Sequence, residues 1–238
     1  MGPVLHRYDE ELVAGRLVER QNRFVLTVEI AGQEADVFLD ETGRLTTVLV
    51  DDATVYCLPA DDPDRSTDYT AVAVDTGEVV ISVRAAMAND LFVSALEGGH
   101  VPAFADATIQ RQEPPLPDHG RTDVLLERDG ADHYVEVKAV THVEDGVGKF
   151  PDAPSDRAVR HLRGLRALVE DGTPASVVFV CQRPDAEVVR PFREIHPEFA
   201  DELAKAMDAG VTAHAVSLSV EPPAYRLDAV DLPVERDD

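Results

Sequence analysis

Short apolar runs separated by turn residues fill the first third of the chain. They occupy residues 12–18, 24–30, 35–39, 45–50, 54–58, 69–74 and 79–83. Each run has the length of a β-strand, and glycine, aspartate or proline lies between most of them. A succession of short strands with closely spaced turns is typical of a small barrel or a sandwich.

The pattern changes at residue 85. Residues 85–97 read as a helix that ends at Gly98-Gly99, so we expect one domain over 1–84 and a second over 85–238. The second domain is then expected to contain strands at 106–112, 121–127, 133–140, 175–182 and 211–220 and helices at 155–170 and 197–209. Strands followed by alternating strands and helices predict a mixed α/β sheet.

One predicted hairpin carries the main candidate chemistry. Residues 133–140 alternate polar and apolar side chains, which places Glu136 and Lys138 on one face of a strand. Asp129-Gly130 is a favoured two-residue hairpin turn. Pairing the residues on either side of this turn puts Asp123 opposite Glu136 on the same face, although a one-residue bulge would reverse that facing.

Two adjacent carboxylates repel each other unless a proton or a cation lies between them, and their hard oxygen atoms suit Mg²⁺ or Mn²⁺. The chain has 19 arginines and only three lysines, so the ammonium group of Lys138 departs from a composition that prefers guanidinium groups. Without this context, a Glu-x-Lys pair on a strand is usually an exposed charge pair. With Asp123 in register, Asp123, Glu136 and Lys138 become a candidate catalytic site.

The predicted helix over 155–170 holds the main basic cluster. Ser155 or Asp156 caps it, and one half of its surface carries Arg157, Arg160, Arg163 and Arg166. The sequence leaves two interpretations open. The arginines can form a surface that follows phosphate groups, or they can pair with the abundant carboxylates of the chain.

Four stretches resemble, in order and spacing, the sugar fermentation stimulation protein A family. They are Arg121-Thr122-Asp123, Tyr134-Val135-Glu136-Val137-Lys138, Phe150-Pro151-Asp152-Ala153 and Arg160-His161-Leu162-Arg163-Gly164-Leu165. The resemblance covers most of the chain and implies an N-terminal OB-like β-barrel followed by a restriction-endonuclease-like α/β domain of the PD-(D/E)xK type. It also implies nucleic-acid binding. The chain departs from the family pattern at Gly120-Arg121, at Arg157-Ala158-Val159-Arg160 and at Asp40-Glu41-Thr42-Gly43.

Together, residues and resemblance lead to a hypothesis of metal-dependent phosphodiester hydrolysis. Asp123, Glu136 and the carbonyl of Val137 would hold Mg²⁺ or Mn²⁺, and Lys138 would orient the attacking water or stabilise the charge on the phosphoryl oxygens. Glu113, Thr141 and Asp152 are candidate supporting residues. The candidate nucleic-acid-binding residues are Arg121, Arg157, Arg160, His161 and Arg163.

Each supporting residue has a simpler interpretation as well. Glu113 can be a loop charge, Thr141 can end the strand, and Asp152 can either orient the basic helix or shape a turn. His161 can be a packing histidine beside the apolar stripe of its helix. The aromatic residues of the first domain, which include Phe24 and Phe38, can be core residues or a stacking platform for bases.

The charge of the chain bears on its partners. With 46 acidic and 22 basic residues, the net charge is −24, which argues against binding a polyanion at low salt. A surface rich in carboxylates and poor in lysine favours a halophilic host. At molar salt the Debye length is about 3 Å, so distant carboxylates hardly repel DNA, while a cationic patch still acts at contact.

The cysteines and the apolar runs of the chain indicate its cellular compartment. Two cysteines, Cys57 and Cys181, are too few and too distant for a disulfide framework or a zinc site. The absence of a signal segment and of a long apolar run favours a cytoplasmic protein with DNA, or RNA, as its partner and no membrane. Two other functions stay open: a non-catalytic DNA-binding regulator of sugar metabolism, and a metabolite-binding α/β protein with a structural acidic pair.

Overall fold

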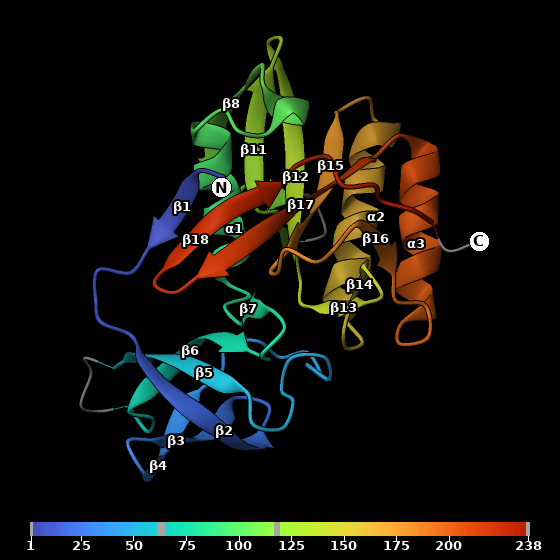
Figure 1. Cartoon of the computed structure of the whole chain (residues 1–238). Coiled ribbons are helices and arrows are strands. Elements are labelled where there is room, and N and C mark those ends of the chain that lie inside the picture. The colour runs from blue at the N-terminus through green and yellow to red at the C-terminus, as the bar shows by residue number, and fades with distance from the viewer. Residues whose placement is uncertain (1, 61–64, 117–119, 237–238) are drawn as a thin grey trace.

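The computed structural model describes residues 2–60, 65–116 and 120–236 and contains two units, a small barrel and a larger α/β unit (Figure 1). The barrel is built from β2 (Val13–Asn22), β3 (Val25–Ile30), β4 (Gln33–Phe38), β5 (Thr54–Pro59) and β6 (Tyr69–Asp75), with β7 (Val80–Ser82) added beside β6. The parallel pairing of β4 with β6 closes the five strands into a barrel. Apolar side chains that alternate along these strands fill its interior. The predicted barrel is confirmed, and the sandwich alternative is excluded.

One strand predicted for the barrel, over residues 45–50, is absent. Residues 45–50 form turns instead of a strand. The backbone of Leu45 has a positive φ of 57°, and its carbonyl accepts hydrogen bonds from the amides of Val48 and Leu49. The side chains of Leu45 and Val48 still belong to the barrel core. The apolar run thus contributes side chains to the barrel core, although its backbone forms no strand of the sheet.

The larger unit is a seven-stranded sheet covered by helices on both faces. Its strands, in spatial order, are β1 (Val4–Arg7), β18 (Ala224–Ala229), β17 (Thr212–Glu221), β15 (Ala175–Cys181), β12 (Ala131–Val140), β11 (Val124–Arg128) and β8 (Ala107–Gln112). The three central strands β12, β15 and β17 are parallel, and the outer strands pair antiparallel. The predicted mixed sheet is therefore confirmed.

The helices divide between the two faces of this sheet (Figure 1). Helix α1 (Met87–Glu97) packs on one face in a core that includes Val135 and Val137 of β12. A short 3₁₀ helix, η1 (Pro102–Phe104), follows it. Helices α2 (Asp156–Glu170) and α3 (Pro197–Ala209) pack on the opposite face. Ser155 caps α2, because its side chain accepts a hydrogen bond from the amide of Ala158 at 3.2 Å.

Two small sheets complete the fold. One is the pair β9 (Pro115–Leu116) and β10 (Gly120–Arg121), and the other contains β13 (His142–Glu144), β14 (Val147–Phe150) and β16 (Val188–Pro191). The first strand of the chain also departs from the expected division at residue 84. Because β1 pairs with β18, residues 4–7 lie in the large sheet and the chain enters the barrel only afterwards.

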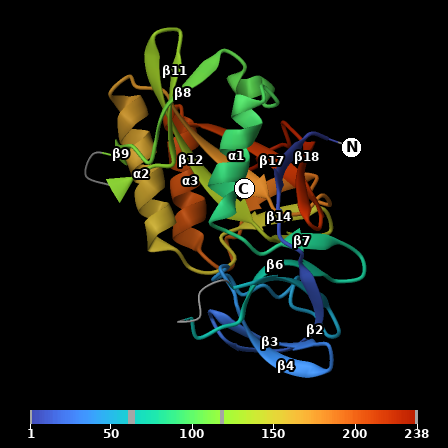
Figure 2. The same ribbon diagram turned by 90° about the vertical axis from the view of Figure 1, so that its left-hand side faces the viewer.

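The two units face each other across the lower ends of α1 and α2 (Figure 2). Backbone hydrogen bonds join them, among them one from the amide of Ser82 to the carbonyl of Gln182 at 2.9 Å. The hydroxyl of Tyr225 donates to the carbonyl of Val72 at 2.9 Å. Cys57 in the barrel and Cys181 in the large sheet are buried free thiols.

His133 on β12 is a buried histidine of the large sheet, and its pKa predicts how the stability of the protein depends on pH. Its Nε2 lies 2.6 Å from the Ser176 hydroxyl, and burial lowers the pKa of its ring to about 4. Below about pH 6.5 the unfolded chain takes up a proton that the native state excludes. The free energy of unfolding should therefore fall from pH 6.5 to pH 4 by up to about 3 kcal/mol more in the wild type than in His133→Gln. Urea unfolding at a series of pH values measures this, and parallel pH dependences would contradict it.

Candidate active site

The hairpin that carries the acidic site folds in the predicted register. Val124 pairs with Val135 and Arg128 with Ala131, so the next position places Asp123 opposite Glu136. The turn residues Asp129 and Gly130 have φ values of 53° and 76°. Two successive positive φ values are what a type I′ hairpin turn requires, which explains why this dipeptide fixes the register.

Glu136 lies at the centre of a buried polar cluster. Its side chain is only 2% exposed. The Oε1 atom accepts a hydrogen bond from Lys138 Nζ and also contacts Nδ1 of His161 on α2. The other oxygen, Oε2, is buried and has no hydrogen-bond partner among the described residues. A buried carboxylate oxygen without a donor is costly, so this atom calls for a further ligand.

Asp123 completes the acidic pair. Its Oδ2 accepts a hydrogen bond from the Val137 amide at 2.7 Å. Burial, and then the neighbouring Glu136 carboxylate, raise the pKa of Asp123 to about 6. Burial also opposes ionisation of Glu136, but Lys138 and His161 together hold the pKa of that carboxyl below its ordinary value. The pKa values of the two carboxyl groups are therefore shifted in opposite directions: Glu136 is ionised at neutral pH, and its negative charge makes ionisation of Asp123 harder.

The pair opens into a pocket of about 320 Å³ between the two units. Its lining contains Asp123, Glu136, Val137 and Lys138 from the hairpin, Asn89 from α1, Ser155 and Arg157 from the start of α2, and Glu41 from the barrel. Asn89 Oδ1 is a second buried oxygen without a partner in the described parts of the chain. Neither Asn89 nor Glu41 was predicted as a site residue, because both reach the pocket only through the packing of distant segments.

The donor set fits a divalent cation of the Mg²⁺ or Mn²⁺ type. Glu136 Oε2 lacks a partner, the Asp123 carboxylate lies beside it, and Val137 lines the same pocket. Over residues 2–60, 65–116 and 120–236, no three His, Cys, Asp or Glu side chains form a ligand group for a metal. Two protein carboxylates are enough for Mg²⁺, because this ion usually keeps several bound waters and takes further ligands from substrate phosphates.

Two of the predicted supporting residues lie outside this pocket. The Glu113 amide donates to the Asp123 carbonyl at 2.8 Å, but its side chain is largely exposed and pairs with Arg121 at 3.3 Å, so its role as a further acid stays a prediction. Thr141 is buried beyond the end of β12, and its carbonyl accepts a hydrogen bond from Arg183 Nη1 at 3.4 Å. It follows the last residue of β12 and is absent from the lining of the acidic pocket, so its support of Lys138 stays a prediction.

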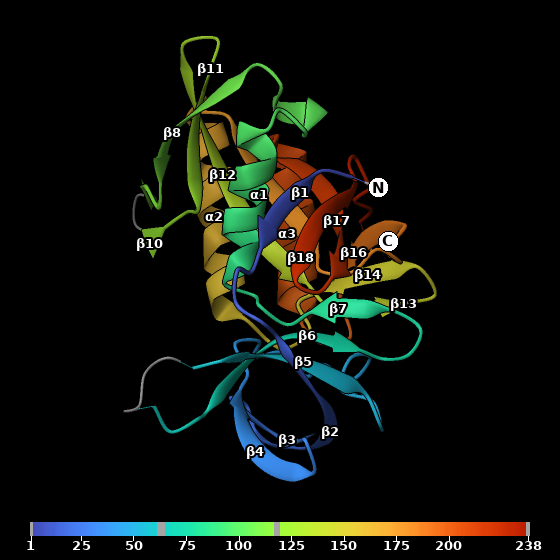
Figure 3. The same ribbon diagram turned by 60° about the vertical axis from the view of Figure 1, so that its left-hand side comes forward.

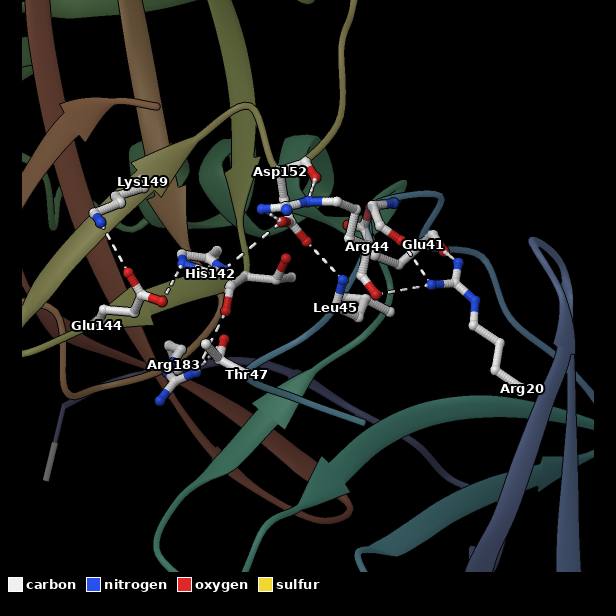
Figure 4. Close-up of polar contacts among 12 residues, drawn as sticks. Arg20, Glu41, Arg44, Leu45, Thr47, His142, Glu144, Lys149, Asp152 and Arg183 are labelled. Carbon is white, nitrogen blue, oxygen red and sulfur yellow. Dashed lines mark hydrogen bonds and ion pairs between the residues drawn. The ribbon is translucent and has the colours of Figure 1, made fainter. Parts of the chain in front are cut away.

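Asp152 joins the two units (Figure 4). Its Oδ2 accepts a hydrogen bond from the Leu45 amide at 2.6 Å, and its Oδ1 pairs with the Arg44 guanidinium at 3.2 Å. Arg44 Nε also donates to the Asp152 carbonyl, and His142 Nδ1 lies 3.6 Å from Oδ1. Asp152 therefore fixes the barrel to the larger unit. Its role as a supporting residue of the site, or in orienting the basic helix, stays a prediction.

The four arginines of α2 do not all behave alike: some pair with carboxylates of the chain, and others do not. Arg163 pairs with Glu198 at 2.7 Å and Arg166 with Glu202 at 3.1 Å, so these two bind α3 carboxylates. Arg157 lines the pocket, where its Nε donates to His161 Nε2 at 3.4 Å, and Arg160 is exposed; in the described parts of the chain neither guanidinium forms an ion pair with a carboxylate. His161 is 3% exposed and contacts Glu136, so it is part of the acidic cluster and not of an exposed binding surface.

The raised pKa of Asp123 predicts a stability effect of its own. Between pH 4 and 6 the native carboxyl holds a proton that the unfolded chain loses, so the native state is destabilised as the pH rises. In EDTA at pH 7, Asp123→Asn should increase the free energy of unfolding by about 1 to 2 kcal/mol, since the amide removes a repelling charge. Guanidinium unfolding of both proteins measures it, and a variant less stable than the wild type would contradict it.

The fold and the site define a two-domain protein in which an OB barrel precedes a restriction-endonuclease-like domain. Residues 18–83 match the SfsA N-terminal OB domain, and residues 86–224 match the sugar fermentation stimulation protein RE domain. The chain belongs to the sugar fermentation stimulation protein family.

Relatives from distant organisms cover almost the whole chain. A sugar fermentation stimulation protein homolog of Acetivibrio thermocellus is 38% identical over 230 residues, with 96% of this chain and 98% of the relative aligned. The homolog of Methanobrevibacter smithii is 35% identical over 212 residues, covering 84% and 88%. The solved structure of Pyrococcus furiosus SfsA in complex with Ca²⁺ superposes with a TM-score of 0.88 at 26% identity, covering 98% of this chain and 99% of that one. In the described parts of the present chain, no helix is long and apolar enough to cross a membrane.

Proposed function

We propose that this protein binds nucleic acid, DNA or RNA, and hydrolyses its phosphodiester bonds with Mg²⁺ or Mn²⁺. The observation that carries the proposal is the unpartnered Glu136 Oε2 beside Asp123 and Lys138 in a pocket open to solvent. The Ca²⁺ in the Pyrococcus furiosus relative supports it, because Ca²⁺ prefers the same hard oxygen ligands.

The protein residues have separate tasks in this proposal. Asp123 and Glu136, with the Val137 carbonyl, would hold the cation, and a cation there polarises the scissile phosphate and lowers the pKa of a bound water. Lys138 neutralises one oxygen of Glu136 in the free protein and can donate to a phosphoryl oxygen as negative charge develops. His161 contacts the same oxygen, Oε1, so Lys138 and His161 together fix the Glu136 carboxylate and leave Oε2 for the cation.

Phosphate groups would be held at the start of α2. Arg157 lines the pocket, Arg160 is exposed nearby, and the first turn of the helix directs its amides to the same end. Helix N-termini favour anions, and arginine binds phosphate oxygens in a bidentate manner. These contacts position the backbone of the substrate and carry no base specificity.

The proposal is tested by incubating plasmid DNA, single-stranded DNA and RNA with the wild-type protein in KCl, with Mg²⁺, with Mn²⁺ or with EDTA. Cleavage that needs the divalent ion supports hydrolysis. Binding without cleavage under every condition would indicate a non-catalytic regulator on a nuclease scaffold. Absence of any binding, together with no effect of the ion on melting, would indicate a metabolite-binding protein whose acidic pair is structural.

The net charge of −24 leads to a prediction about salt. Carboxylates distributed over the surface repel one another, and salt screens this repulsion. If the protein works in a halophilic cytoplasm, its melting temperature should rise by several degrees between about 0.1 M and about 2 M KCl. Thermal unfolding followed by circular dichroism measures the change. A melting temperature that is constant or falls with KCl would contradict the halophilic interpretation.

A further inference from the structure

A second pocket lies on the barrel; Asp123 and Glu136 do not line it, and among the described residues Asp40 is the one carboxylate that its lining contains. Its volume is about 850 Å³, within the range of pockets that bind small ligands. Its lining combines aromatic, cationic and hydroxyl groups: Phe24, Phe38, Arg65, Arg84, Thr67 and Thr70. This combination of flat rings and guanidinium groups suits a base and the phosphate attached to it.

Phe24 is the exposed ring of this pocket. It is 48% exposed, more than any other large apolar side chain among the described residues. Its backbone is nevertheless fixed in the turn between β2 and β3. The Phe24 amide donates to Asn22 Oδ1 at 2.8 Å, and its carbonyl accepts from the Leu39 amide at 2.8 Å. An exposed aromatic ring carried on a fixed backbone has few torsion angles left to order, so it can stack a base at little cost in conformational entropy.

Arg65 places a cation in the same pocket. Its guanidinium lies over the Phe38 ring, with 5.7 Å between the guanidinium carbon and the ring centroid. Its Nη2 donates to the hydroxyls of Thr67 and Thr70 at 3.3 and 3.1 Å. On the other side of the pocket, Arg84 is paired with Asp40 at 3.3 Å. The positive charge of Arg65 is thereby held next to the aromatic surface.

This pocket adjoins the acidic pocket. Ala86 lines both of them, while Arg84 lines the barrel pocket and Ala85 the acidic one. These residues form the connection between β7 and α1, where the barrel meets the larger unit (Figure 3). A nucleotide chain that starts in the barrel pocket therefore reaches the acidic pocket across residues 84–86.

We propose that the barrel pocket binds an unpaired base of a single strand, stacked on Phe24, and that the strand continues into the acidic pocket. A base within a duplex is stacked and paired, so its ring faces are not available to Phe24. The preferred substrate is then single-stranded nucleic acid, or a duplex with an unpaired end. The course of the strand rests on the proposed function, whereas the base pocket itself requires no metal.

The test measures binding in EDTA, where hydrolysis is excluded. A fluorescein-labelled deoxythymidine strand of about 12 nucleotides, within the site size of OB domains, is compared by fluorescence anisotropy, at one KCl concentration, with a blunt-ended duplex of two annealed complementary strands. Phe24→Ala and Phe24→Leu should raise the Kd for the single strand at least about fivefold, which corresponds to about 1 kcal/mol. Phe24→Trp should keep the wild-type affinity. Val18→Ala, which changes an exposed apolar side chain outside this pocket, serves as the matched control.

Three outcomes would overturn the inference: no binding of the single strand by the wild type, an unchanged Kd in both Phe24→Ala and Phe24→Leu, or equal affinity for the blunt-ended duplex. Because Phe24 is exposed, circular dichroism should show that all variants fold. The outcome is separate from that of the proposed function. A protein that binds the strand through Phe24 but never cleaves it retains this inference and loses the hydrolytic one.

Discussion

Glu136→Gln should lower the rate of Mn²⁺-dependent cleavage of DNA by at least about a thousandfold, equivalent to about 4 kcal/mol of transition-state stabilisation. The substitution keeps the shape of the side chain but removes the negative charge that would hold the cation. It also removes the charge partner of Lys138 and His161, so the polar cluster around the site is disturbed as well. Initial cleavage rates at saturating Mn²⁺ measure the effect.

The matched control for this experiment is Glu127→Gln. Glu127 lies on the same hairpin, is exposed, and accepts a hydrogen bond from Gln110 at 2.9 Å. Glu127→Gln changes the net charge by the same amount as Glu136→Gln, and it should leave the cleavage rate within about twofold of the wild type, as expected for a surface substitution. Equal cleavage rates for wild type and Glu136→Gln would remove Glu136 from the mechanism.

Asp152→Ala should lower the free energy of unfolding by about 2 to 3 kcal/mol, because it removes a buried carboxylate that accepts a hydrogen bond from a buried amide and pairs with the half-exposed Arg44 guanidinium. The carboxylate is nearly buried and binds both the Arg44 guanidinium and the Leu45 amide (Figure 4). Its loss leaves a buried N–H without an acceptor and a guanidinium without its partner. Guanidinium unfolding measures the change, and two separate transitions would show that the barrel and the larger unit have come apart.

Glu144→Ala is the control for the second experiment. Glu144 belongs to the same polar network, but it is half exposed and pairs with Lys149 at 2.8 Å. An exposed pair of this kind contributes about 1 kcal/mol or less. If Asp152→Ala and Glu144→Ala cause equal losses, the connection between the units does not depend on Asp152.

The acidic hairpin could be predicted from the sequence because its geometry is determined locally. The turn dipeptide Asp129-Gly130 and the alternation along β12 fix the register, and the register brings Asp123 and Glu136 together. The barrel and the mixed sheet follow from similar local patterns. Helix α2 was predicted almost to the residue, since Ser155 caps it and its apolar stripe is regular.

The features that sequence reasoning missed depend on contacts between distant segments. Arg44 and Asp152 are 108 residues apart, and nothing near either of them indicates the other. The pairing of β1 with β18 likewise joins the two ends of the chain. The run at 45–50 has the composition of a strand, yet its apolar side chains are buried as a turn inside the barrel. Burial alone does not distinguish these two structures.

A calorimetric titration with Mn²⁺ measures whether Asp123 and Glu136 hold a divalent cation. The wild type should show saturable binding, and Asp123→Asn and Glu136→Gln should each weaken it at least about tenfold, the loss of about 1.4 kcal/mol. Mn²⁺ binding of equal strength in all three proteins, or no binding to the wild type, would contradict the account.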